Sequence, residues 1–150
     1  MKYLATYALL LLVCIQPNQG FSQSGNKPSQ FSNFPDVINC TVTELDKVFS
    51  LTPGQPVSLS FSDNFIFNGA VTGNTVKYNN LQGANIKSPF FHNSLFNISK
   101  RVNDDNSITY VGRIINRNYF DGYELRKNTD GNYQLIKIET DKVIQDCSQL

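Results

Sequence analysis

Side chains that could perform acid–base or nucleophilic chemistry are few in this chain. His92 is the only histidine, so neither an HExxH zinc site nor a cage of several histidines can form. Serines are abundant, but no GxSxG nucleophile elbow is present. His92 lies in an aromatic-rich segment, residues 89–93, where a single histidine is more often a packing or surface residue than a catalyst. We therefore predict no catalytic residue, no metal site and no cofactor.

A pair of carboxylates is the remaining catalytic arrangement to consider, because glycosidases hold two acids a few ångströms apart. Asp121 and Glu124 are the candidates. Three aromatic residues near them in the sequence could frame a ligand: Tyr119, Phe120 and Tyr123. Turns also recruit aspartate for backbone hydrogen bonding without any catalysis. We favour a structural turn here, and a small carboxylate-dependent hydrolase stays open as an alternative function.

Arginine side chains give the one face-specific pattern that points to binding. Residues 107–117 are predicted to form a strand on which Arg113 and Arg117 share a face with Val111. Arg126 on the following predicted strand extends the same face. Arginines mixed with apolar residues on a sheet face are enriched in protein interfaces, although ordinary solvated faces carry them too. Our candidate binding residues are therefore Arg113, Arg117 and Arg126. The opposite row is more apolar and is predicted to face the core: Ile108, Tyr110, Gly112 and Ile114.

Two of the three cysteines are predicted to form a disulfide bond. Cys40 and Cys147 lie near the two ends of the patterned region, and they remain as a pair if Cys14 is removed with a signal peptide. An oxidising compartment would favour their joining. Closing so long a loop is worth up to ~4 to 5 kcal/mol in the chain-entropy model. The alternative, two thiols that serve as nucleophile or metal ligand, is disfavoured because no CxxC spacing is present.

The N-terminus has the pattern of a secretory signal peptide. Lys2 is followed by a nearly unbroken apolar run, residues 4–15. Such a run is too short to cross a bilayer, which takes about 20 residues, but it suits the apolar region of a signal. Small residues favour cleavage before Gln23, so residues 1–22 are the predicted signal peptide. Lipid attachment at Cys14 is the alternative form of processing.

The remainder is predicted to be one domain. Residues 23–33 are polar and contain Gly and Pro, which is typical of a flexible leader, and the domain is expected to occupy residues 34–150. Cleavage removes one basic residue, Lys2, which leaves 12 basic and 12 acidic residues and a formal charge of zero. No overall field therefore attracts nucleic acid or anionic lipid. No second long apolar run is present, so we expect no transmembrane segment in the mature chain.

A short helix is predicted at the start of this domain. Apolar residues recur at helical spacing: Val42, Leu45, Val48 and Phe49. Thr41 and Glu44 form a capping-box pattern, and Thr52-Pro53-Gly54 ends the element.

The rest of the domain is predicted to be strands joined by turns. Val57, Leu59 and Phe61 alternate with serines, which indicates a strand with one buried face. Seven more strands are expected, at residues 65–71, 75–78, 84–88, 95–102, 107–117, 122–127 and 132–139. Asp130-Gly131 between the last two is a good hairpin signal. Links this short exclude parallel crossovers, so we predict a mainly β domain whose antiparallel meander forms a small sandwich or barrel, with α+β as the alternative class.

These observations favour an exported, non-enzymatic domain that acts by binding a protein, either secreted or in the periplasm. A pro-domain, inhibitor or accessory domain of a secreted hydrolase is the main alternative function, because such a product also needs no chemistry of its own.

Overall fold

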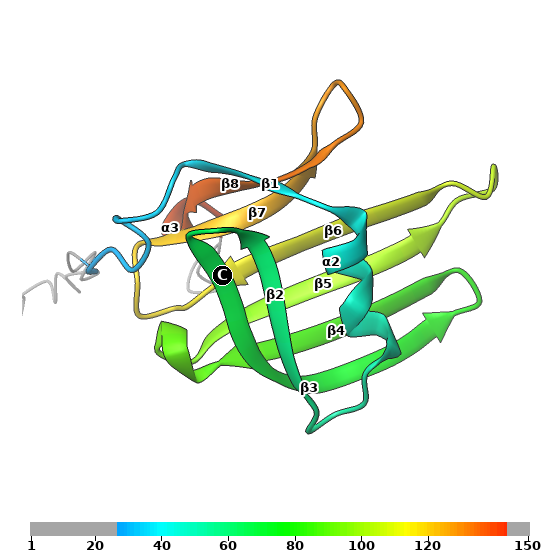
Figure 1. The fold of residues 1–150 in the computed structure, drawn as a ribbon, viewed down its shortest axis with the longest axis horizontal. Helices are drawn as coiled ribbons and strands as arrows, with labels where there is room; N and C mark the ends of the chain where they lie inside the picture. The colour runs from blue at the N-terminus through cyan, green and yellow to red at the C-terminus, as the bar shows by residue number, and fades with distance from the viewer. Residues whose placement is uncertain (1–26, 144–150) are drawn as a thin grey trace, which may run out of the picture.

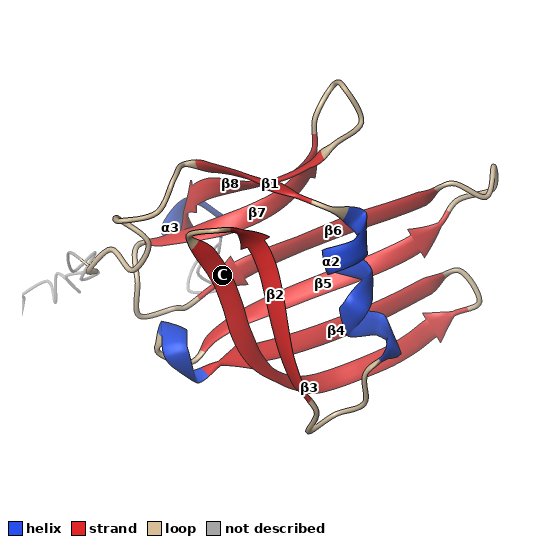
Figure 2. Cartoon of the chain, viewed as in Figure 1, coloured by secondary structure: helices blue, strands red, loops and turns tan. Residues whose placement is uncertain are grey.

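The computed structural model describes residues 27–143, which form one antiparallel sheet that curls into a nearly closed barrel (Figures 1 and 2). The eight strands are arranged in the order β1-β8-β7-β6-β5-β4-β3-β2, so the first strand lies beside the last and the others follow chain order. The strands are β1 (Val37–Cys40), β2 (Pro56–Ser62), β3 (Phe65–Tyr78), β4 (Leu81–Ser88), β5 (Ser94–Val102), β6 (Ile108–Ile115), β7 (Asp121–Lys127) and β8 (Tyr133–Glu139). The predicted antiparallel, mainly β fold is confirmed, and it takes the form of a barrel.

Short helical segments lie between and after the strands. They are α2 (Val42–Asp46), η1 (Lys47–Ser50), η2 (Pro89–Phe91) and α3 (Thr140–Val143). The predicted helix start is confirmed, since the hydroxyl of Thr41 accepts the N–H of Glu44 at 3.3 Å. The carboxylate of Glu44 does not complete the capping box but accepts the N–H of Ser60 on the edge strand β2 at 3.0 Å. Helix α2 therefore covers part of an edge that would otherwise be open to pairing.

Alternation along the strands builds the core inside the barrel. Val57, Leu59 and Phe61 of β2 are buried while the serines between them are exposed, as the sequence pattern predicts. Aromatic rings fill much of the interior: Phe61, Phe65, Phe67, Phe96 and Tyr123 are all buried. Because large rings occupy the space, the barrel interior is a packed core, as is usual for barrels of about eight strands.

Two strand predictions are corrected by the structure. Residues 65–71 and 75–78 belong to one long strand, β3, in which Gly73-Asn74 does not make a turn. The ladder with β4 shifts register at Val71/Gly73, so the glycine lies at a bulge that bends the strand. Strand β1 was not predicted at all, and it pairs with β8 from Val37 opposite Ile136.

The segment before β1 is also corrected. Residues 23–33 were expected to be a flexible leader, but Phe31 is fully buried in the core. Its ring packs against Tyr123 at 5.2 Å and against Phe91 at 5.5 Å between centroids. We call residues 29–34 the N-terminal strap, because they close one end of the barrel. The folded domain therefore begins before Phe34.

Several predictions concern residues outside the described range. These are the signal peptide at residues 1–22, the cleavage before Gln23, and two cysteines, Cys14 and Cys147. Among residues 27–143, no helix has the length and apolar character needed to cross a membrane.

Candidate functional site

Strands β6 and β7 pair over only part of their length. Their ladder consists of three residue pairs, from Ile114 opposite Tyr123 to Gly112 opposite Leu125. Beyond Gly112 the two strands diverge, and each continues with its other neighbour toward a separate hairpin (Figure 1). We call the opening between residues 108–111 of β6 and residues 126–127 of β7 the split.

A side chain replaces the missing strand pairing at the split. The hydroxyl of Tyr133, from β8, accepts the N–H of Tyr110 at 3.0 Å and lies 3.4 Å from the carbonyl oxygen of Ile108, to which it donates. These are two β6 backbone groups that have no β7 partner. Buried backbone groups need such partners, because leaving one unpaired costs about 1 to 3 kcal/mol.

Gly112 stands at the point where β6 leaves β7. A Cβ atom at this position would lie 2.7 Å from the backbone oxygen of Asn97 and 3.1 Å from the ring of Phe96. The absence of a side chain therefore permits a close approach between β5 and β6 just where the sheet divides.

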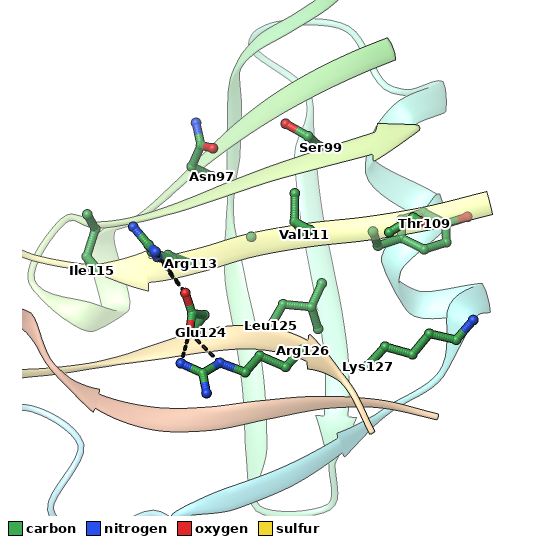
Figure 3. A pocket seen from close by; sticks show the side chains of 12 residues that line it. Asn97, Ser99, Thr109, Val111, Arg113, Ile115, Glu124, Leu125, Arg126 and Lys127 are labelled. Atoms are coloured by element: carbon green, nitrogen blue, oxygen red, sulfur yellow. Dashed lines mark hydrogen bonds and ion pairs between the residues drawn. The ribbon is translucent and has the colours of Figure 1, made fainter. Parts of the chain in front are cut away.

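Outside the barrel, the divergence leaves a groove of about 870 Å³ across β5, β6 and β7 (Figure 3). Polar side chains of β5, Asn97 and Ser99, line one side. Its remaining outward-facing side chains are Thr109, Val111, Arg113, Ile115, Glu124 and Arg126, and Lys127 lines it at the end of β7. Val111 is 57% exposed, so the groove offers apolar as well as charged contact.

Glu124 joins two of the predicted binding residues. The Nε and Nη2 atoms of Arg113 donate to its Oε1 at 3.0 and 2.8 Å, and the guanidinium of Arg126 donates to its Oε2 (Figure 3). The cross-strand register explains the first contact, since Arg113 lies directly opposite Glu124. We call Arg113, Glu124 and Arg126 the arginine cluster.

Exposure differs within the arginine cluster. The side chain of Glu124 is 16% exposed, whereas those of Arg113 and Arg126 are 46% and 59% exposed. Partial burial acts to raise the pKa of Glu124, but the hydrogen bonds from Arg113 and Arg126 outweigh it, so its pKa lies below the ordinary value. Glu124 is therefore ionised at neutral pH, and the guanidinium groups keep N–H donors on their solvent-facing sides.

Arg117 lies apart from these residues. Strand β6 ends at Ile115, and Arg117 is exposed in the turn that follows, outside the groove lining. The face assignment itself is correct for Tyr110 and Ile114, which are buried. Ile108 of the same row is 40% exposed because β6 has already left β7 at that position.

The two candidate carboxylates do not converge. Asp121 is 4% exposed, and it accepts hydrogen bonds from Ser29 Oγ and from the backbone N–H groups of Gln30 and Phe31. Glu124 points to the outer face (Figure 3). Asp121 therefore holds the N-terminal strap, and the two acids cannot act as a catalytic pair.

Glu124 and Tyr133 have roles that sequence reasoning missed. Glu124 was considered only as a catalytic acid, because its position opposite Arg113 depends on strand register. Tyr133 lies in a predicted strand, residues 132–139, and no role was assigned to its side chain. A signal for the first was available in the alternation, since the register that pairs two predicted strands would have placed an acid beside a base.

No cluster within residues 27–143 brings together three histidine, cysteine, aspartate or glutamate side chains in a way that could hold a metal ion. His92 is exposed at the end of η2 and has left-handed backbone geometry, with φ of 50°. No protein-family model matches this chain, and comparisons with curated proteins and with solved structures find no match either.

Proposed function

We propose that this chain is an exported domain that binds an acidic segment of a partner protein in the groove over β5, β6 and β7. The observation that carries the proposal is the arginine cluster. Glu124 fixes the two guanidinium groups side by side, so little side-chain freedom would be lost when a second carboxylate binds. Arginine is suited to this role because its planar fork can bind a carboxylate with two hydrogen bonds.

Charge supports an acidic partner. The groove is lined by three basic side chains, Arg113, Arg126 and Lys127, and by one acidic side chain, Glu124. This is a local excess of two positive charges in a chain whose predicted mature form has no net charge. Complementary charge at an interface increases the association rate and the discrimination against wrong partners.

Apolar contact supports a protein partner over a small ion. Val111 and Ile115 lie in the groove beside Arg113, on the same face of β6 (Figure 3). An arginine beside apolar side chains is a common composition for the energetically important part of a protein interface.

The export pattern of residues 1–22 supports a secreted or periplasmic location for this chain. Its partner would then also lie outside the cytoplasm, either in the extracellular space or in the periplasm. A secreted hydrolase for which this domain is an inhibitor or accessory piece would be one such partner. The predicted bond between Cys40 and Cys147 belongs to the same proposal, because it requires an oxidising compartment.

The test is a pull-down from culture fluid with three tagged proteins as baits: the wild type, R113A/R126A and K77A/K87A. Lys77 and Lys87 are exposed on β3 and β4, so the last variant removes two charges away from the groove. A partner at the groove should bind the wild type and K77A/K87A, and it should lose roughly 1 to 2 kcal/mol of affinity for each arginine removed. The affinity of the captured partner for each purified protein is then measured by calorimetry. Equal affinity for all three would reject the groove as the binding site.

A further inference from the structure

The split leaves strand edges inside the sheet. From Ile108 to Val111, β6 is paired only with β5, and at Arg126 and Lys127, β7 is paired only with β8. A strand without a neighbour presents N–H and C=O groups that can pair with another chain. Many domains bind extended peptides in this way, with main-chain hydrogen bonds for affinity and side-chain sites for specificity.

Tyr133 already occupies the β6 groups that an added strand would use. One hydroxyl serves both the N–H of Tyr110 and the carbonyl of Ile108. One residue of an added strand has the same capacity, since its main chain carries one donor and one acceptor. The hydroxyl can therefore be exchanged for peptide backbone without leaving either β6 group unpaired.

Side chains around the split define which peptide would fit. On the outer face, a strand in this position would lie between Val111 of β6 and Arg126 of β7, next to Arg113. On the inner face it would meet buried side chains, namely Tyr110, Leu125 and Tyr133. Because successive side chains of a strand point to opposite faces, a complementary peptide has acidic residues alternating with apolar ones.

We infer that the partner segment binds as an added β-strand along residues 108–111 of β6, with its alternate acidic side chains on the arginine cluster. This inference rests on the function proposed above and specifies the conformation and sequence pattern of the ligand. The peptide backbone replaces the hydroxyl of Tyr133 at the N–H of Tyr110 and the carbonyl of Ile108.

A synthetic peptide of alternating valine and glutamate, blocked at both ends, is the probe. Its binding to the full chain is followed by ¹H–¹⁵N NMR, with the amide of Tyr110 as the reporter. Two N-methylated forms, each methylated on one set of alternate residues, separate backbone pairing from charge attraction. One form should bind about ten-fold or more weakly, because its hydrogen bonds to β6 are lost, and the other should bind like the parent. Equal binding by both forms, or no binding of the parent at millimolar concentration, overturns the inference.

Two further arms complete the test. The Tyr133→Phe variant removes the competing hydroxyl, so a folded Y133F protein should bind the parent peptide about five-fold more tightly, and unchanged affinity would contradict the exchange. If Y133F does not fold, the N-methylated peptides still test strand addition on the wild-type protein. A third outcome is that both N-methylated forms bind the wild type equally well and neither binds R113A/R126A. That result would reject strand addition but support recognition of acidic residues at the groove. The two proposals can therefore fail separately.

Discussion

The carboxylate of Asp121 on β7 accepts the backbone N–H of Phe31 at 2.8 Å, although the two residues are 90 positions apart in the chain. The same carboxylate accepts the N–H of Gln30 at 2.6 Å and the hydroxyl of Ser29. One buried side chain thus holds the strap that carries Phe31 into the core. Its contribution to stability should be large, because the buried N–H of Phe31 would otherwise be left without a partner.

Replacement of Asp121 by Asn should lower the free energy of unfolding by about 2 to 4 kcal/mol. The amide keeps one acceptor oxygen but turns an NH₂ group toward backbone donors. Urea denaturation followed by circular dichroism measures the loss. The matched control is Asp130→Asn in the exposed β7–β8 turn, which should change stability by less than ~0.5 kcal/mol. Equal stability of the two variants would show that the strap does not depend on Asp121.

Asn74 links the bulged strand β3 to the end of η1. Its Nδ2 lies 2.7 Å from the carbonyl oxygen of Leu51 and 3.1 Å from that of Phe49. Asn74→Ala should cost about 1 to 3 kcal/mol, because the carbonyl of Leu51, just after η1, loses its donor, whereas that of Phe49 keeps Gln82 Nε2 at 2.9 Å. Asn79→Ala, in the exposed β3–β4 turn, is the control. A thermal midpoint equal to that of the control would contradict this capping role.

Gly112→Ala should destabilise the sheet at the split by about 1 to 3 kcal/mol. The new methyl group would meet a backbone oxygen, that of Asn97, which cannot rotate away. Gly83→Ala on β4 is the control, since its Cβ would meet only the hydroxyl of Ser99 at 3.7 Å. We expect this control to be neutral or slightly stabilising. Chemical denaturation measures the free energy of unfolding of both variants. If Gly112→Ala is as stable as Gly83→Ala, a steric role for Gly112 is ruled out.

The pKa of Glu124 should rise in the double variant R113A/R126A, because burial then acts without the opposing arginines. Carboxyl ¹³C NMR titration measures this directly, with K77A/K87A as the charge-matched control. In the wild type the folded-state pKa is depressed, so Glu124 stabilises the fold above its unfolded-state pKa. That contribution is lost as the pH falls through the folded-state pKa. An unchanged titration curve in R113A/R126A would mean that the cluster does not form in solution.

The bond between Cys40 and Cys147 should appear in peptide maps made without reduction. Cys40 is 7% exposed on β1, and burial raises the pKa of its thiol to about 12, so a native thiol here would resist alkylation. Two thiols that react only after unfolding would refute the pairing.

The local sequence pattern was sufficient to predict the strands that have one buried face. Alternation in β2 and turn residues around β7 and β8 predicted these elements to within one or two residues. Gly73-Asn74 was misleading because the same dipeptide favours a turn and a bulge, and only pairing with β4 distinguishes them. Strand β1 is four residues long, too short for a period of two to stand out.

Tertiary partners decide what the sequence pattern could not predict. Phe31 is a single aromatic residue in a polar stretch, and its burial depends on Asp121, far along the chain. The outward direction of Arg113 follows from alternation, so it could be predicted. Its contact with Glu124 and the split itself follow from where β6 and β7 separate, which is a property of the whole barrel.

Both ends of the described chain meet at one loop. The N–H of Phe120 donates to the carbonyl of Pro28 at 3.0 Å, and its own carbonyl accepts the N–H of Thr140 at 2.7 Å. The β1–β8 pair nearest to these ends is Val37 with Ile136. Once a force between the two ends has withdrawn the N-terminal strap, it would load the β1–β8 hydrogen bonds one after another, because hydrogen bonds in an antiparallel pair run across the strands. Single-molecule stretching should detach β1 at low force, and rupture of the whole barrel in one high-force event would contradict this mechanical weakness.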